Sequence, residues 1–270
     1  MAQSGGILTR NWFDLLNLGL RIAPAAGTDY PYLDHPGAVR NYVHLPRAAS
    51  GEGFTVDGWF AGLEAGRTFV TSGPLLSFSI NGAEMGEEIR VAAGEPLRIT
   101  ARASLLPDLD RLERLELIEQ GEALASQTAA APGVGPAAAA SSDYTLVLDH
   151  CATANRSTWF VVRADGSRTV LHDLSLTQTG AISAVSAPIY VVDGDERTWK
   201  REAVAGIVDR LVSALDGLQG TSLESAAEHE WWETGPVWQR TWARQIAARS
   251  DRIDAARSRL RELGEQAGRE

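Results

Sequence analysis

Asp29 has the setting that most strongly suggests chemistry, because it follows an apolar segment and a Gly-Thr turn. It lies in the stretch AAGTDYPYLDHPG (residues 25–37), with a second acid and His35 close behind it. A carboxylate in this position either binds a cation or caps the next turn. The residue types alone leave both interpretations open.

Two arginines could bind an anionic substrate group beside such a site. They are Arg40, in AVRNYVHLP, and Arg67, in AGRTFVTSGP. A guanidinium presents a rigid fork of donors that suits carboxylates and phosphates. Arg67 could equally form a buried ion pair. His150 and Cys151 are neighbours, and on a strand they would point to opposite faces, which argues against a shared site.

An α/β arrangement is predicted for the segments around Asp29. Residues 11–20 have the apolar spacing of a helix, and residues 20–27 read as a short strand that ends just before Asp29. Residues 38–46 alternate like a second strand. A short helix follows, with Val56, Trp59, Phe60 and Leu63 on one face and Gly66 at its end.

The pattern changes to period two at about residue 75, where short strands alternate with turn residues such as Asn81-Gly82. This spacing, without helices between, predicts an antiparallel β-sandwich. Helical periodicity returns near residue 200, and a long helix is predicted over 237–263. We therefore expect three parts, which are residues 1–74, 75–195 and 196–270.

Composition excludes several classes of protein. The chain has 270 residues, 44% of them hydrophobic, and a formal net charge of −10. Such an acidic chain is a poor binder of duplex nucleic acid or of anionic membranes. The single cysteine, Cys151, excludes an internal disulfide and a cysteine zinc cage. No apolar stretch is long enough to span a membrane and no signal peptide is evident, so we expect a cytoplasmic protein.

Three stretches carry a family resemblance: LLNLGLRIAPAAGTDY, GWFAGLEAGRTFVTSGPLLSFSING and SAPIYVVDG. They resemble the C-terminal part of the CehA/McbA-like (carbaryl-hydrolase-like) metallohydrolases of the PHP superfamily. The resemblance implies the end of a distorted β/α barrel, then an antiparallel β-sandwich and a C-terminal helical segment. It also implies hydrolysis of a small-molecule ester, amide or phosphoester by water that a divalent metal (Zn, Mn or Fe) activates.

One metal-ligand motif of that family maps onto this chain. Gly27-Thr28-Asp29 matches its first part, which makes Asp29 the expected ligand, but Pro31 stands where a histidine often follows. His35 is the nearest substitute. The family's His-x-His pair does not occur among the five histidines. The resemblance therefore implies the C-terminal portion of an enzyme that holds no metal stably by itself.

Such a portion would need a cover for its barrel strands, because two strands cannot close a barrel and would leave edges exposed. We expect an upstream barrel half, self-association or the chain's own C-terminal helices to provide it. The alternative interpretation is a non-catalytic β-sandwich that binds a partner or a carbohydrate.

Overall fold

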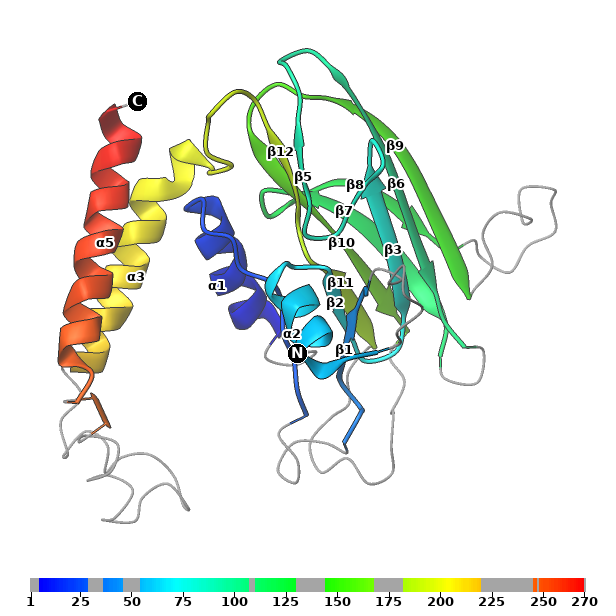
Figure 1. Cartoon of the computed structure of the whole chain (residues 1–270), viewed down its shortest axis with the longest axis horizontal. Coiled ribbons are helices and arrows are strands. Elements are labelled where there is room, and N and C mark those ends of the chain that lie inside the picture. Colours follow the sequence, from blue (N-terminus) through cyan, green and yellow to red (C-terminus); the bar gives the residue numbers. More distant parts are fainter. Residues whose placement is uncertain are drawn as a thin grey trace. The chain divides into compact units, whose positions relative to one another are not determined.

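The computed structural model of the chain describes residues 5–28, 36–45, 54–106, 110–129, 144–167, 182–219, 245–246 and 248–269 (Figure 1). The chain divides into two compact units, residues 1–199 and 200–270. The first unit carries, in chain order, α1 (Gly5–Asn17), β1 (Arg40–Val43), α2 (Val56–Glu64), β2 (Thr68–Thr71), β3 (Leu75–Ile80), β4 (Ala83–Glu84), β5 (Glu88–Arg90), β6 (Pro96–Ser104), β7 (Leu112–Glu119), β8 (Glu122–Thr128), β9 (Thr145–Thr153), β10 (Thr158–Gly166), β11 (Ser183–Ser186) and β12 (Ile189–Val192). The second unit carries η2 (Arg201–Ala203), α3 (Val204–Gln219) and α5 (Ser250–Arg269).

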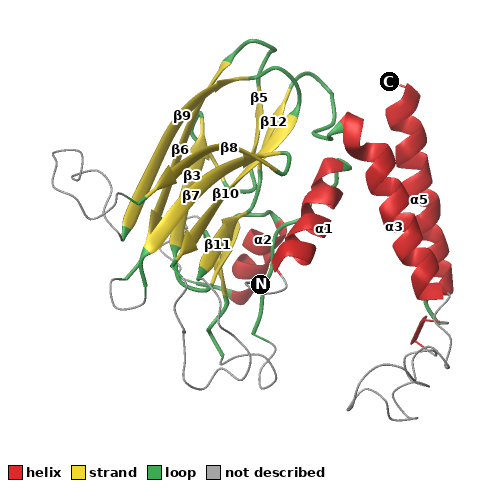
Figure 2. Ribbon diagram, turned by 180° about the vertical axis from the view of Figure 1, so that it is seen from behind, coloured by secondary structure: helices red, strands yellow, loops and turns green. Residues whose placement is uncertain are grey.

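Two β-sheets pack face to face in the first unit (Figure 2). The larger, eight-stranded sheet has the order β1-β2-β11-β10-β12-β5, with β7 paired to β10 and β8 paired to β7. The smaller sheet has the order β4-β3-β6-β9. Pairing is antiparallel except between β12 and β5. The predicted antiparallel β-sandwich is therefore present.

The core between the sheets follows from the period-two pattern. Along β6, buried and exposed residues alternate, and Leu97, Ile99 and Ala101 turn inward. The β3–β4 hairpin closes at Asn81-Gly82, both with positive φ (50° and 89°), as a type I′ turn requires. The sequence predicts this turn correctly.

Helix α1 covers the outer face of the larger sheet. Its Trp12 and Leu16 pack against Trp159 and Tyr190 in a second apolar cluster. The helix stops where Gly19 takes a φ of 77° and donates its backbone N–H to the carbonyl of Leu16. The larger sheet is therefore buried on both faces over β10 and β12.

The region around β1 differs from the α/β prediction. Residues 20–27 form no strand, and the Asn41 side chain bonds the backbone of Ala26 there in place of a strand partner. β1 and β2 belong to the same sheet as β11, because β2 pairs with β11 from Phe69 to Thr71. Strands from both sides of the predicted boundary at residue 74 therefore share the sandwich.

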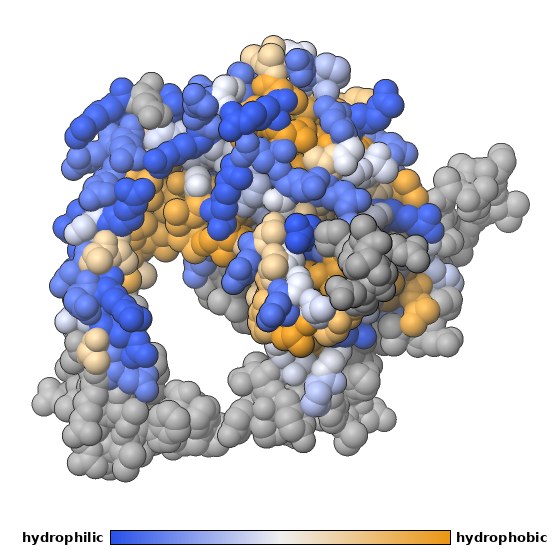
Figure 3. All heavy atoms as spheres, in the orientation of Figure 1, coloured by the Kyte–Doolittle hydropathy of each residue, from blue (hydrophilic) through white to orange (hydrophobic). Residues whose placement is uncertain are grey.

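Helix α2 begins at the N-cap Thr55, whose hydroxyl accepts the backbone N–H of Gly58, and it ends before Gly66, as predicted. Its predicted apolar face is not fully covered. Val56 and Phe60 are 59% and 53% exposed, and apolar side chains are visible over α2 in Figure 3.

The second unit pairs α3 with α5, and Leu260 and Leu263 of α5 are buried. An ion pair of 2.8 Å joins Arg257 to Asp216 across the two helices. Of the predicted helix at 237–263, the structure describes the part in α5 (Ser250–Arg269), and Trp238 and Trp242 lie outside the described residues. No described helix is both long and apolar enough to cross a membrane.

Because Tyr190 is buried, we expect the protein to lose stability at high pH. Burial raises the pKa of Tyr190 from 10.0 to about 12, against weaker opposing effects of Arg21 and the Ile22 backbone. The folded state favours the neutral phenol, so this contribution is complete below pH 10 and is lost as the pH rises through about 12. Between pH 10 and about 12, the free energy of unfolding should fall in the unaltered protein. We expect this fall to be about 2 kcal/mol larger than in Tyr190→Phe, which has no phenol to titrate. Urea titrations across that range test this, and parallel pH profiles would contradict it.

Candidate functional site

The face that β1 and β2 share carries the polar and aromatic side chains of the candidate site. Side chains alternate along a strand, so Arg40, Tyr42 and His44 project to the same side. Antiparallel register sets Tyr42 opposite Phe69, and their rings stack at 5.0 Å with planes 2° apart. This stacked pair forms one wall of the site.

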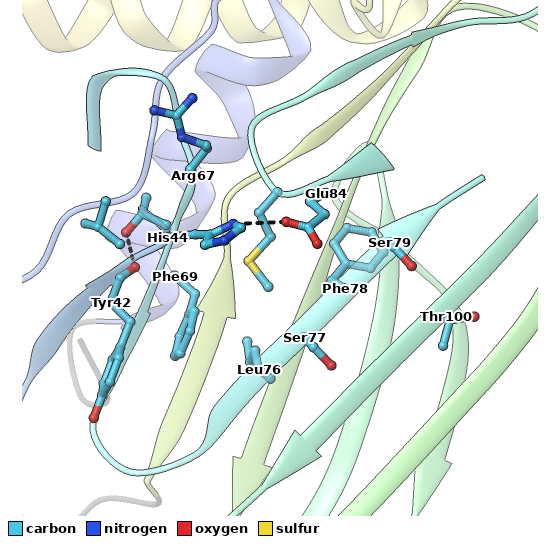
Figure 4. A pocket seen from close by; sticks show the side chains of 13 residues that line it. Tyr42, His44, Arg67, Phe69, Leu76, Ser77, Phe78, Ser79, Glu84 and Thr100 are labelled. Carbon is cyan, nitrogen blue, oxygen red and sulfur yellow. Dashed lines mark hydrogen bonds and ion pairs between the residues drawn. The ribbon is translucent and has the colours of Figure 1, made fainter. Parts of the chain in front are cut away.

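A pocket of about 400 Å³ lies between this wall and the edge of the smaller sheet (Figure 4). Its apolar lining includes Phe69 on one side and Leu76, Phe78 and Met85 on the other. Leu76 and Phe78 also belong to the sandwich core, which holds this side of the pocket rigid. The volume lies within the range of small-ligand sites.

His44 and Glu84 join the two sides at one end of the pocket. His44 Nδ1 lies 3.0 Å from Glu84 Oε2, and the two side chains are 62% and 59% exposed. At that exposure the contact contributes little to stability. A carboxylate at Nδ1 favours the tautomer that leaves Nε2 unprotonated, so His44 could accept a proton or bind a cation there.

Arg40 and Arg67 are the predicted anion-binding residues, and each keeps a buried Nε without a hydrogen-bond partner among the described residues. Arg67 follows α2, and its carbonyl accepts the backbone N–H of His44 at 2.8 Å. In Figure 4 the guanidinium of Arg67 points away from Tyr42 and Phe69. A buried donor without a partner is costly, so both arginines are suited to an incoming anion.

The segment that leads to Asp29 is fixed next to β1. The side-chain amide of Asn41 accepts the N–H of Ala26 at 3.0 Å and donates to its carbonyl at 2.7 Å. These two hydrogen bonds from one side-chain amide place Gly27 and Thr28 near the start of β1. The predicted metal ligands Asp29 and His35 lie outside the described residues.

The described residues contain no group of three or more His, Cys, Asp and Glu side chains that could hold a metal ion. Cys151 is exposed on β9, and its neighbour His150 turns to the other face, as the alternation predicts. The described part of the chain therefore does not fit a metal cluster.

Tyr42, Phe69 and Glu84 are among the pocket residues that the sequence-based prediction does not include. A signal for the aromatic pair exists, because RNYVH and RTFVT each carry an aromatic two residues after an arginine. No comparable signal exists for Glu84, because its partner His44 lies far away in the sequence.

Comparisons with known proteins give little guidance. No family profile and no curated protein matches the sequence. Among solved structures, the fibronectin(III)-like modules of Clostridium thermocellum CbhA match with 16% identity and a TM-score of 0.22. The match covers 43% of this chain and 98% of that chain. A score this low carries no argument, and the architecture rests on the observed strand pairing.

Proposed function

We propose that this chain is the C-terminal portion of a PHP-type metal-dependent hydrolase that cleaves a small-molecule ester, amide or phosphoester. The sequence resemblance to CehA/McbA-like proteins around Gly27-Thr28-Asp29 motivates the proposal. The structural observation that supports it is the Asn41 clamp on Ala26, which ties the segment that leads to Asp29 to β1, the strand that also carries Arg40 with its unpartnered buried Nε. A bound metal and a nearby arginine would both stabilise the negative charge of a substrate.

In this proposal the chain supplies recognition and a minority of the metal ligands. Asp29 and His35 are the proposed ligands, and the remaining ligands come from a PHP barrel portion carried elsewhere. A bound divalent metal would activate water and polarise the scissile bond. Because the described residues do not assemble such a centre, the contribution assigned to them is anion binding by Arg40 and Arg67.

Asp29→Asn tests the proposal. We expect the chain, mixed with a PHP barrel portion as a second polypeptide, to bind Mn, Zn or Fe and to hydrolyse 4-nitrophenyl acetate or bis(4-nitrophenyl) phosphate. Loss of one carboxylate ligand should lower kcat/KM by about 100-fold or more, with loss of bound metal. Metal content by plasma mass spectrometry and turnover are measured together.

Asp57→Asn is the matched control, because Asp57 is an exposed carboxylate in the first turn of α2. It should leave both metal content and kcat/KM unchanged. Equal behaviour of the two variants, or no metal and no turnover in the mixture, would exclude the hydrolase proposal.

A second candidate function, a non-catalytic β-sandwich binding module, is favoured by the pocket between the sheets. It predicts ligand binding that chelators do not affect. Binding that survives removal of all metal, in a mixture without hydrolysis, would select this candidate.

A further inference from the structure

Strand β9 is the last strand of the smaller sheet, and one of its two edges is open. On one side it pairs with β6 over its whole length, from Thr145 to Thr153. On the other side no described strand pairs with it, since β8, the edge strand of the larger sheet, pairs only with β7. Figures 1 and 2 both show β9 at the outer margin of the sandwich. An open edge of this length is a template for pairing with a further strand.

Backbone hydrogen bonds at the two ends of β9 fix which of its residues face the open edge. Leu105 donates its N–H to the carbonyl of Tyr144 at 2.9 Å, and Ala154 donates its N–H to the carbonyl of Glu95 at 2.9 Å. The register between β6 and β9 runs without a bulge between these two points, so the even-numbered residues of β9 bond to β6. The N–H and C=O groups of the odd-numbered residues therefore point to the open edge. These residues are Thr145, Val147, Asp149, Cys151 and Thr153.

An acid and an arginine lie close to this edge on the outer face of the sheet. Leu146 and Leu148 are buried in the core, so Asp149 and Cys151 project to the outer face, where both are exposed. Arg98 of β6 lies opposite Cys151 in the register and is also exposed. Neither Asp149 nor Arg98 has an ion pair within the described part of the chain.

We propose that β9 pairs antiparallel with β9 of a second copy of this chain, with Asp149 opposite the second copy's Cys151. In this register Val147 lies opposite the second copy's Thr153. Each odd-numbered residue between them exchanges both of its backbone hydrogen bonds with the residue opposite. The two smaller sheets then form one continuous sheet across the two copies. This pairing goes beyond the proposed hydrolase function and does not depend on it.

Charge complementarity favours this register over full overlap of the two strands. Full overlap would set Asp149 directly opposite the second copy's Asp149, where like charges repel. In the proposed register Asp149 faces a small cysteine instead, and the second copy's Arg98 lies one strand further in the same row. Two strand spacings separate their backbones by about 10 Å, which an arginine and an aspartate side chain span together.

The same complementarity identifies a second copy as the occupant. The chain carries both members of the contact, the acid on β9 and the arginine on β6. Two-fold symmetry forms the contact between Asp149 and Arg98 twice, once from each copy. Contacts through a single pair of strands are small and belong to the weak, transient class of interfaces.

Sedimentation velocity and amide hydrogen exchange of the full chain test the pairing together. We expect monomer at about 1 µM and dimer at about 1 mM. Over that range, exchange at the Asp149 and Cys151 amides should slow by about fivefold or more as the dimer forms. The Leu148 and His150 amides already bond to β6, so their exchange should not respond, which makes them an internal control.

Charge reversal tests the register. Arg98→Glu and Asp149→Arg should each raise the dimer dissociation constant by about tenfold, because each change acts twice in a symmetric pair. An equimolar mixture of the two variants should dimerise again with the original affinity, since each copy then carries the charge that the other lacks. Rescue in the mixture also shows that both variants fold.

Arg10→Glu is the control with the same change of charge, at an exposed residue of α1. It should leave the dissociation constant unchanged. A chain that stays monomeric at about 1 mM would overturn the proposal. So would a dimer in which the Asp149 and Cys151 amides exchange freely, because its interface would lie elsewhere. A mixture of the two variants that does not recover affinity would overturn the register.

Discussion

Gly86→Ala should destabilise the first unit by about 4 kcal/mol, which is among the largest effects expected from a single methyl group. A Cβ at Gly86 would lie 2.4 Å from the carbonyl oxygen of Ala65 and 2.4 Å from the carbonyl carbon of Gly66. Both are backbone atoms, so the clash cannot be relieved by a side-chain rotation. Gly86 also has a φ of 86°, which other residues adopt at a cost.

The contact between Gly66 and Gly86 positions the candidate site. It holds the turn after α2, which leads to Arg67, against the turn that follows Glu84 of β4, and both of these residues line the pocket. We therefore expect Gly86→Ala to separate His44 from Glu84 as well. Urea unfolding followed by near-ultraviolet circular dichroism measures the stability change.

Gly82→Ala is the control for backbone strain alone. Gly82 has a φ of 89°, but a Cβ there would meet no atom within 4 Å. Its cost should be about 1 kcal/mol. Equal losses for the two variants would mean that the turns can move apart freely.

Asn17→Ala is expected to cost about 2–4 kcal/mol, because Asn17 links α1 to the sandwich through a buried polar network. Asn17 Oδ1 accepts the indole N–H of Trp159 at 3.1 Å, and its Nδ2 donates to the carbonyl of Gln120 at 3.2 Å. Gln120 in turn donates to the carbonyl of Trp199 at 3.1 Å. Alanine would leave the Trp159 N–H and the Gln120 carbonyl buried without partners.

Asn11→Ala on the same helix is the matched control, because Asn11 is exposed. Its effect should stay within about 0.5 kcal/mol. The Trp159 indole N–H gives a second readout, since its exchange with solvent should accelerate only in Asn17→Ala. A stability loss without that acceleration would assign the effect to the helix rather than to the network.

The sequence by itself determined the features that depend on neighbouring residues. The alternation after residue 75 specifies the strands of the sandwich, and Asn81-Gly82 specifies a hairpin turn. Gly19 and Gly66 end their helices, because each can adopt a positive φ at low cost. Arg40 and Arg67 stay a prediction from residue type, since a guanidinium suits an anion.

Only the tertiary structure decided which of these elements meet. The apolar run before Asp29 has the composition of a strand, but the Asn41 side chain takes the hydrogen bonds of Ala26 that a strand would have made. Pairing of β2 with β11 places β1 and β2 in the sandwich sheet, and it joins residues more than a hundred positions apart. The contacts of His44 with Glu84 and of Gly66 with Gly86 likewise join separate segments of the chain. Such contacts depend on long-range packing, which leaves no local pattern in the chain and therefore could not be predicted from it.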